Sequence, residues 1–498
     1  MNRQNRQNLW MFPLGTVGRD MIYALFSNYI LTYVLFTRQL TPAQLTALTA
    51  IMVAARVFDG LNDPIMGNII ERTRTRYGKF KPWLVIGIVC TSVVVYLAFH
   101  TDLQGWAFIA YFAVIYFLFS IAFTMHDISY WGMVAALSSD ADTRNQLTSR
   151  ATLFAGVGGT LAAMLIPMFT TGSMALGGST SVAYGYIALI VCILSPLFLC
   201  FTIFGVKETR VQETREVPPI SLKKIVSTIT GNDQLMWVAL IFLIHQVGNG
   251  LVLGGLGSTY IYFDFGYSGG LYSLFSTVGM MASAVLMVGY PAISRRVPRK
   301  KLLHVMMAAS AAGYALMLAA GLLLPAAMPK FWLLTLGYMA ANFGQYCFYL
   351  ILMISIINTV EYNEYRHGTR DEAIIASLRP FLTKLGSALV VALTSLSYLV
   401  FGVTSYTNQI SAFENAASGG LMTEAEKLAS IDGVLSTVQP WQTCGLILCL
   451  TVLPCLFMLA AYLLYQKHYR LDEKEYERIC AQLASRAEEP AHVGTETL

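Results

Sequence analysis

The chain has 498 residues, of which 56% are hydrophobic and 12% are charged, and its mean hydropathy is +0.57. This composition excludes a soluble enzyme and predicts a protein that crosses a membrane many times. The formal net charge of +5 comes from basic clusters beside apolar runs, which indicates anchoring at a membrane surface rather than nucleic-acid binding.

Apolar runs of about 20 residues, the length that crosses a bilayer, recur along the whole chain. No cleavable leader is visible, because Arg3 and Arg6 precede a run that is too long for a signal-peptide core. The runs are continuous rather than alternating with period two, which argues against a transmembrane barrel. The sequence therefore predicts an all-α membrane protein with twelve transmembrane helices, near 9–36, 43–70, 83–100, 106–137, 144–171, 182–205, 232–263, 268–293, 302–325, 331–360, 373–403 and 441–465.

Lysine and arginine are distributed unevenly between the two ends of these helices. If both termini are cytoplasmic, only Arg38, Lys330 and Lys427 of the 33 basic residues lie in outer loops. This bias follows the positive-inside rule and predicts cytoplasmic termini. The densest inner clusters follow the helices predicted at 43–70 and 268–293, and they comprise Arg72, Arg74, Arg76, Lys79 and Lys81, then Arg295, Arg296, Arg299, Lys300 and Lys301.

A polar stretch at 207–224 separates the first six predicted helices from the next six. We predict an N-terminal bundle at 1–205, a cytoplasmic linker at 206–231, a C-terminal bundle at 232–465 and a cytoplasmic tail at 466–498. Two six-helix halves with a substrate site between them at mid-membrane are a common plan of secondary transporters. The longest outer loop, at 404–440, is compatible with a short surface helix, and the sequence assigns it no chemistry.

Ionisable residues inside the apolar runs are the strongest functional signal, and they are Arg19, Asp20, Arg56, Asp59, Asp63, Asp127 and Lys384. A charge in hydrocarbon costs at least ~2.5–3.5 kcal/mol, so such residues usually face a polar cavity on an ion or substrate path. At ~1.5 Å per residue, Asp20, Asp59, Asp127 and Lys384 each lie ~15–18 Å from the inner surface, near the middle of a ~30 Å core. Four predicted helices therefore bring charge to one plane of the membrane.

The helix predicted at 43–70 carries two carboxylates on one face, because Asp59 and Asp63 are four residues apart. Such close carboxylates repel each other unless a cation or a proton lies between them. Together with Asn62 they offer hard oxygen ligands that suit Na⁺, whereas a raised carboxyl pKa would suit H⁺. The alternative is a structural ion pair with Arg56 and a helix bend near Pro64, although one arginine cannot fully neutralise two acids.

The helix predicted at 106–137 ends in F-T-M-H-D-I-S-Y-W, which places Thr124, Asp127 and Trp131 on one face. A carboxylate that accepts hydroxyl hydrogen bonds beside a flat aromatic ring is typical of sugar binding. The alternative is a tryptophan at the membrane interface beside an aspartate that packs helices. The predicted mid-membrane depth favours the sugar interpretation.

Four further charged residues lie in the predicted plane of Asp127 or near it. Asp20 lies on the first helix, where it corresponds to Asp127 in the other three-helix repeat, so both could contact one ligand. Arg19 and Arg150 could donate to sugar hydroxyls or could neutralise these acids, and Arg150 begins its helix so early that it could lie at the inner mouth. Lys384 could pair with an acid across the cavity, bind substrate or report the state of the site.

With these residues in place, the chain resembles the glycoside–pentoside–hexuronide:cation symporters, the melibiose-permease-like branch of the major facilitator superfamily. The motifs that carry the resemblance are R-V-F-D-G-L-N-D-P-I-M-G-N-I-I-E-R-T-R-T-R-Y-G-K-F-K-P-W (56–83), D-I-S-Y-W (127–131) and E-Y-N-E-Y-R-H-G-T-R-D-E-A (361–373). The resemblance implies a cation site at Asp59, Asn62, Asp63 and Thr124, with Asp59 and Asp63 as metal ligands if the ion is Na⁺. It also implies a sugar site that involves Arg19, Asp20, Asp127, Trp131, Arg150, Lys384 and an aromatic residue at Tyr349.

Three positions depart from the family pattern. Ser129 stands where the family commonly has proline, Phe123 where relatives can have tyrosine, and Pro380 where a polar residue can face the sugar. These changes leave the fold prediction intact, and the particular glycoside is not predicted.

The combined prediction is symport of a sugar with Na⁺, Li⁺ or H⁺ by alternating access in the bacterial cytoplasmic membrane. The expected partners are the sugar, the cation and the lipid bilayer, with no organic cofactor, no nucleic acid and no enzymatic chemistry. Ion pairs at the inner side are expected to hold the outward-open state, and their candidates are Arg72, Arg74, Arg76, Lys79, Glu361, Glu364 and Arg370. The alternatives are an uncoupled facilitator or exporter and a membrane sensor that binds sugar without transporting it.

Overall fold

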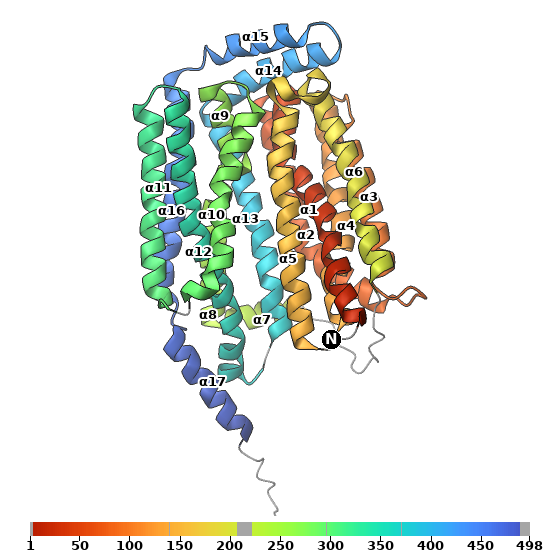
Figure 1. The fold of residues 1–498 in the computed structure, drawn as a ribbon, viewed down its shortest axis with the longest axis vertical. Coiled ribbons are helices and arrows are strands. Elements are labelled where there is room, and N and C mark those ends of the chain that lie inside the picture. Colours follow the sequence, from red (N-terminus) through yellow and green to blue (C-terminus); the bar gives the residue numbers. More distant parts are fainter. Residues whose placement is uncertain (1–2, 139, 207–221, 295, 370, 489–498) are drawn as a thin grey trace, which may run out of the picture.

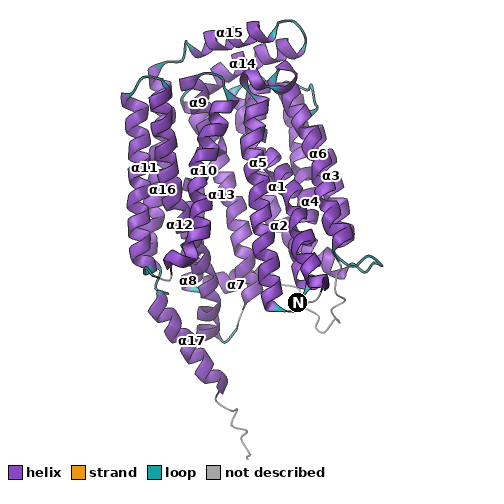
Figure 2. Ribbon diagram, viewed as in Figure 1, coloured by secondary structure: helices purple, strands orange, loops and turns teal. Residues whose placement is uncertain are grey.

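The computed structural model describes residues 3–138, 140–206, 222–294, 296–369 and 371–488. Within these ranges the regular structure is helical, and Figure 2 shows only helices joined by loops. Most of the predicted linker, together with Arg295 and Arg370, lies outside the described residues. The all-α membrane fold predicted from the sequence is confirmed.

Each of the first six predicted spans is one long helix in the structure. The helices are α1 (Arg3–Thr37), α2 (Pro42–Arg72), α3 (Lys81–Phe99), α4 (Gly105–Leu137), α5 (Ala141–Thr170) and α6 (Thr180–Gly205). Two short 3₁₀ turns, Gly172–Met174 and Leu176–Gly178, precede α6. The α2 helix starts with a capping box, in which Thr41 and Gln44 satisfy each other's backbone N–H groups.

The seventh predicted span is broken. It consists of α8 (Asp233–Gly250), a π-helical turn at Val252–Leu256 and α9 (Gly257–Phe265). Gly255 has a φ of 119° in this turn, a backbone conformation that glycine tolerates and other residues avoid. The remaining helices are α7 (Leu222–Gly231), α10 (Gly269–Ser294), α11 (Arg299–Leu323), α12 (Met328–His367), α13 (Glu372–Val400), α14 (Val403–Ser418), α15 (Glu424–Leu435), α16 (Pro440–His468) and α17 (Glu473–Glu488).

Among the described residues, ten helical segments are long and apolar enough to cross a membrane, and the bent α2 would bring the number to eleven. The α1 helix is outside that set, and it carries Arg19 and Asp20 in its middle. A count of twelve spans is compatible with these helices and stays a prediction.

Helices from distant parts of the chain pack side by side. The α1 helix packs against α5 and α6, and α4 packs against α2 and α3. After the linker, α8 packs against α13 and α16, while α12 packs against α10 and α11. Two pairs, α2 with α13 and α5 with α10, join the helices before the linker to those after it (Figure 1). The predicted domain boundaries themselves stay a prediction.

The chain at 404–440, where the sequence is compatible with one surface helix, forms the two helices α14 and α15, which we call the lid helices. They lie across one end of the molecule, here called the lid end, whereas α17 and the start of α1 lie at the opposite end (Figure 1). The lid helices contact the first half through polar groups. Asn408 of α14 forms two hydrogen bonds with the backbone of Leu40, at 2.8 and 2.9 Å.

A fully buried ion pair strengthens this contact. Glu414 of α14 accepts hydrogen bonds from the backbone N–H and the hydroxyl of Thr180, at 2.7 and 3.0 Å, where α6 begins. Lys427 of α15 lies 3.4 Å from Glu414 and donates to the carbonyl of Gly178 at 2.7 Å. Burial raises the pKa of Glu414, and the ammonium of Lys427 acts against that rise. Because a carboxylate at a helix N-terminus is stabilised by the helix dipole, Glu414 fastens the lid helices to α6.

The three basic residues that the sequence places in outer loops are all buried. Arg38 donates to the carbonyl of Thr37 and to Tyr33, Lys330 pairs with Asp264 at 2.8 Å, and Lys427 pairs with Glu414. Their exposed fractions are 2%, 4% and 0%. These cations therefore hold the lid end together and are not part of a charged outer surface.

Candidate functional site

The candidate site is built on one face of α4. Ser120, Thr124, Asp127 and Trp131 follow one another at helical spacings of three or four residues, so their side chains form one stripe along the helix. Thr124 is the point at which two groups of contacts meet, because it lies one turn from both Ser120 and Asp127. The α2 helix contacts one end of this stripe and α1 contacts the other.

At the first end, two carboxylates of α2 meet two hydroxyls of α4 in the same register. Ser120 donates a hydrogen bond to Asp59, and Thr124 donates to Asp63 at 3.1 Å. Both pairs are four residues apart on their own helices, so the carboxylates and hydroxyls form a compact set of oxygen atoms. The amide nitrogen of Asn62 is also buried and has no hydrogen-bond partner among the described residues.

Two internal cations balance these carboxylates. Arg56 lies 3.8 Å from Asp59, and both side chains are less than a tenth exposed. Lys384 of α13 forms a 2.6 Å ion pair with Asp63, with side-chain exposures of 15% and 26%. Of the roles that the sequence left open for Lys384, the structure therefore displays the pairing with an acid. This ion pair joins α2 to α13 and hence one half of the molecule to the other.

At the second end, Arg19 of α1 is shared by two acids. It donates to Asp20 at 2.8 Å and to Asp127. Its guanidinium lies 5.6 Å from the ring centres of both Phe123 and Trp131, which adds cation–π attraction. The two carboxylates are 23% and 28% exposed, whereas Arg19 is 10% exposed. In this arrangement the single positive charge of Arg19 is shared by two carboxylates, which remain partly exposed.

Two residues that the sequence assigns to the sugar site lie elsewhere. Arg150 donates to the carbonyl of Leu9 at 3.3 Å and lies 4.8 Å above the ring of Trp10, near the start of α1. Tyr349 of α12 packs beside the rings of His245 and Tyr346, at 6.5 and 5.6 Å between ring centres. The early position of Arg150 in its helix had left open a place at the inner mouth.

Most of the contacts that the structure shows for the candidate gating residues are with nearby parts of the chain. Lys79 pairs with Glu71 at 2.7 Å, and Arg76 donates to the neighbouring Tyr77 at 2.5 Å. The remaining positions are Arg72, exposed at the end of α2; Arg74, which donates to the carbonyl of Glu71; Glu361, which interacts with Tyr476 of α17; and Glu364, whose carbonyl accepts from Gly368. Arg370 lies outside the described residues. The gating assignment stays a prediction.

Ser120 is the site residue that sequence reasoning missed. It is 3% exposed and contacts Asp59 directly. Its position four residues before Thr124, the same spacing as Asp59 and Asp63, is the signal that could have identified it.

The chemistry of this site is that of hard oxygen ligands. Among the residues that the structure describes, no group of three or more His, Cys, Asp or Glu side chains is placed to hold a metal ion. Carboxylates and hydroxyls suit a small hard cation and not a soft transition metal. The side chains of Asp59, Asp63, Ser120 and Thr124 therefore suit an alkali cation or a proton.

Comparison with known proteins gives one family and several relatives. The family model described as MFS/sugar transport protein matches residues 11–473. The lactose permease of Leuconostoc lactis is 28% identical over 418 residues, covering 79% of this chain and 62% of that protein. The raffinose carrier protein of Pediococcus pentosaceus is 25% identical, covering 95% and 70%. The glucuronide carrier protein homolog of Escherichia coli (strain K12) is 23% identical and covers 97% of both chains.

Solved structures share the fold at low sequence identity. An inward-facing, unoccupied bacterial homolog of the human lysosomal transporter Spinster has a TM-score of 0.63 at 11% identity and covers 95% of this chain and 100% of its own. A D-xylose–proton symporter has a TM-score of 0.59 at 13% identity and covers 93% and 97%. These structures support the transporter fold and nothing finer.

The Asp63–Lys384 ion pair leads to a stability prediction. Lys384→Met leaves the Asp63 carboxylate half-buried without its cation, and we expect a loss of ~1–3 kcal/mol. Adding Asp63→Asn should restore most of that loss, because the two residues interact directly. The measurement is the unfolding midpoint of the purified protein in detergent. Adding Asp20→Asn to Lys384→Met is the control that should give no rescue, and strictly additive losses for positions 63 and 384 would contradict the pairing.

Proposed function

The chain belongs to the MFS/sugar transport protein family, and from that premise we propose that it moves a sugar across the membrane together with a monovalent cation by alternating access. The family and the relatives are membrane transporters and not enzymes, and the apolar helices and bacterial relatives make this a multi-pass protein of the bacterial cytoplasmic membrane. The chain spans 62% of the length of the Leuconostoc lactis lactose permease. Coupling to a cation and the identity of the sugar are therefore proposed.

One observation carries the proposal: two acidic sites share the α4 stripe, and an internal cation already occupies each of them. Arg19 holds Asp127, and Lys384 holds Asp63. All four side chains keep some exposure, between 10% and 28%. Partly exposed, charge-balanced acids can exchange one partner for another without leaving a bare charge in a low-dielectric interior.

We assign the coupling cation to Asp59, Asn62, Asp63, Thr124 and the newly identified Ser120. An entering Na⁺, Li⁺ or H⁺ takes the place of the Lys384 ammonium on Asp63. The hydroxyls of Ser120 and Thr124 then turn a lone pair toward the ion, because a hydroxyl both donates and accepts hydrogen bonds. No organic cofactor enters this scheme.

We assign the sugar to Arg19, Asp20, Asp127 and Trp131. Sugar hydroxyls donate to the exposed carboxylate oxygens, and the apolar face of the sugar ring stacks on Trp131. Arg19 is already shared by two carboxylates, which favours a neutral glycoside over a hexuronide. The names of the relatives make lactose and raffinose the first sugars to test. Arg150 and Tyr349 are left out of this assignment, because Arg150 contacts Leu9 and Trp10 and Tyr349 packs beside His245 and Tyr346.

Coupling follows from the ion pair between α2 and α13. When the cation displaces Lys384, the two halves lose a connection at mid-membrane, and the freed ammonium becomes a donor beside the sugar site. Thr124 and Asp127 are one turn apart on α4, so each bound ligand changes the electrostatic potential at the binding site of the other ligand. The two affinities must then depend on each other reciprocally.

The decisive experiment is uptake into reconstituted vesicles under imposed Na⁺, Li⁺ or H⁺ gradients, with radiolabelled lactose, raffinose and a glucuronide. We expect one of these gradients to drive accumulation of a neutral glycoside. Asp59→Asn should abolish accumulation and leave downhill sugar exchange, because the variant loses an essential cation ligand. Equal uptake under every gradient would identify a facilitator, and binding without uptake would identify a sensor.

Asp127→Asn should remove sugar binding and leave cation binding. Each hydrogen bond to a charged group is worth ~1.5–3 kcal/mol, so we expect a loss of sugar affinity of at least ~10-fold. Equilibrium dialysis with labelled sugar measures this loss. The unfolding temperature should still rise with the coupling cation, and an unchanged sugar affinity would refute the assignment.

Ser120→Ala should raise the cation concentration that gives half-maximal uptake by ~10-fold, because one oxygen ligand of the carboxylate set is lost. Ser129→Ala is the matched control: Ser129 is also buried on α4, and its hydroxyl has no hydrogen-bond partner among the described residues. Similar cation dependence in both variants would show that Ser120 only packs.

A further inference from the structure

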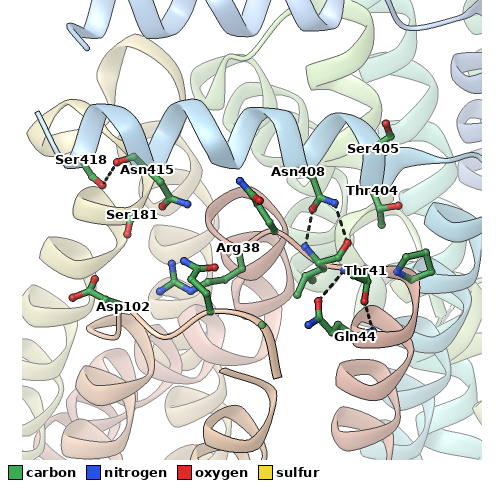
Figure 3. A pocket seen from close by; sticks show the side chains of 15 residues that line it. Arg38, Thr41, Gln44, Asp102, Ser181, Thr404, Ser405, Asn408, Asn415 and Ser418 are labelled. Atoms are coloured by element: carbon green, nitrogen blue, oxygen red, sulfur yellow. Dashed lines mark hydrogen bonds between the residues drawn. The ribbon is translucent and has the colours of Figure 1, made fainter. Parts of the chain in front are cut away.

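A polar cavity lies at the lid end, and its lining shares no residue with the α4 stripe. Its volume is about 930 Å³, and α14 forms its roof (Figure 3). The floor comes from the ends of α1, α2 and α4 and from the start of α6. Amides and hydroxyls dominate the described lining, which has Arg38 and Asp102 as its charged side chains and contains no aromatic ring.

Hydrogen bonds hold the walls of this lid pocket in place. Arg38 donates to the carbonyls of Thr37 and Thr101, so one guanidinium ties together two loops of the floor. Asn408 forms its paired hydrogen bonds with the Leu40 backbone (Figure 3), which fixes the roof to the floor. Hydrogen bonds therefore fix both the roof and the floor of this open pocket.

Several polar atoms in the lid pocket remain available to a ligand. Gln44 is 6% exposed; its carbonyl oxygen accepts from Thr41, and its Nε2 has no recorded partner. Figure 3 places Gln44 at one end of the pocket, with Asp102 and Ser181 at the other. Neither the Asp102 carboxylate nor the Ser181 hydroxyl has a recorded hydrogen bond to the described residues. Both donors and acceptors therefore face the cavity.

We propose that the lid pocket binds a neutral oligosaccharide. One cation and one anion balance each other in the lining, which disfavours strongly charged ligands, while many amides and hydroxyls match the alternating donors and acceptors of a sugar. The volume lies within the ~300–1,000 Å³ range of small-molecule sites. Because no aromatic ring offers a stacking surface, the affinity is weak, on the order of millimolar.

Binding in this pocket favours one state of the transporter. The roof belongs to α14 and the floor to the first half of the chain, so a sugar in the pocket contacts both and stabilises the lid in its docked position. The Glu414–Lys427 pair holds the same contact from the side. Sugar on the lid side therefore keeps the lid end closed, and this action is separate from transport of the sugar bound at the α4 stripe.

The test uses the full chain carrying Asp127→Asn, purified in detergent, so that the α4-stripe site is removed. Saturation-transfer NMR with sucrose and maltotriose should still detect binding, whereas sorbitol, an open-chain polyol, should give a weaker signal. Ser181→Trp fills the pocket and should abolish the signal. Ser436→Trp, at an exposed position after α15, is the matched control and should retain it.

Hydrogen exchange provides the second readout. Maltotriose should slow exchange across α14 in the Asp127→Asn chain and should have no effect once Ser181→Trp is added. Asp102→Leu and Gln104→Leu change exposed loop residues and should weaken binding several-fold even if the tryptophan variant folds poorly. Absence of any sugar signal, or a signal that Ser181→Trp and both loop variants leave unchanged, overturns the proposal. Failure of vesicle uptake would instead refute the transport function and leave this result standing.

Discussion

The constraint on which this structure depends is that an acid inside an apolar bundle must have a cation beside it. Desolvation of an unpaired carboxylate costs several kcal/mol, and the four acids discussed here are all paired: Asp20 and Asp127 with Arg19, Asp59 with Arg56, and Asp63 with Lys384. These cations are attached to helices α1, α2 and α13. Charge balance therefore depends on how these helices are arranged, and in the proposed mechanism a change of ion partner also changes the helix packing.

Exposure separates the acids that can exchange partners from those that cannot. Asp63 and Asp127 keep 26% and 28% of their side-chain surface, so an external ligand can reach them. Glu414 and Lys427 at the lid end are both 0% exposed, and opening that pair means separating two desolvated charges. The partly exposed acids suit a binding site. The buried pair suits a closed contact that opens only when the lid helices move as a whole. Charge pairing thus serves binding at the α4 stripe and closure at the lid end.

The helices and the central residues of the site could be predicted from the sequence, because both depend on local patterns. Apolar runs set the spans, and the four-residue spacing of Asp59 and Asp63 placed them on one face. It did not reach Ser120, since a serine in an apolar helix is common and only the facing carboxylate gives it meaning. It also could not choose between the roles of Lys384, because its partner lies 321 positions away in the chain. Charge counting grouped Arg38, Lys330 and Lys427 at one end of the molecule but did not indicate that each one is buried.

The break between α8 and α9 packs against α13, the helix that carries Lys384. Val390 of α13 packs against Gly254, and Tyr398, two turns further along α13, packs against Gly255. A Cβ at Gly254 would lie 2.5 Å from Val390, so glycine is favoured there by close approach, whereas Gly255 is favoured by its positive φ. Lys384 is on the same α13 helix, less than two turns before Val390. If Lys384 leaves Asp63 as proposed, the change acts on a helix that packs against an interrupted span, where regular helical hydrogen bonds are already absent.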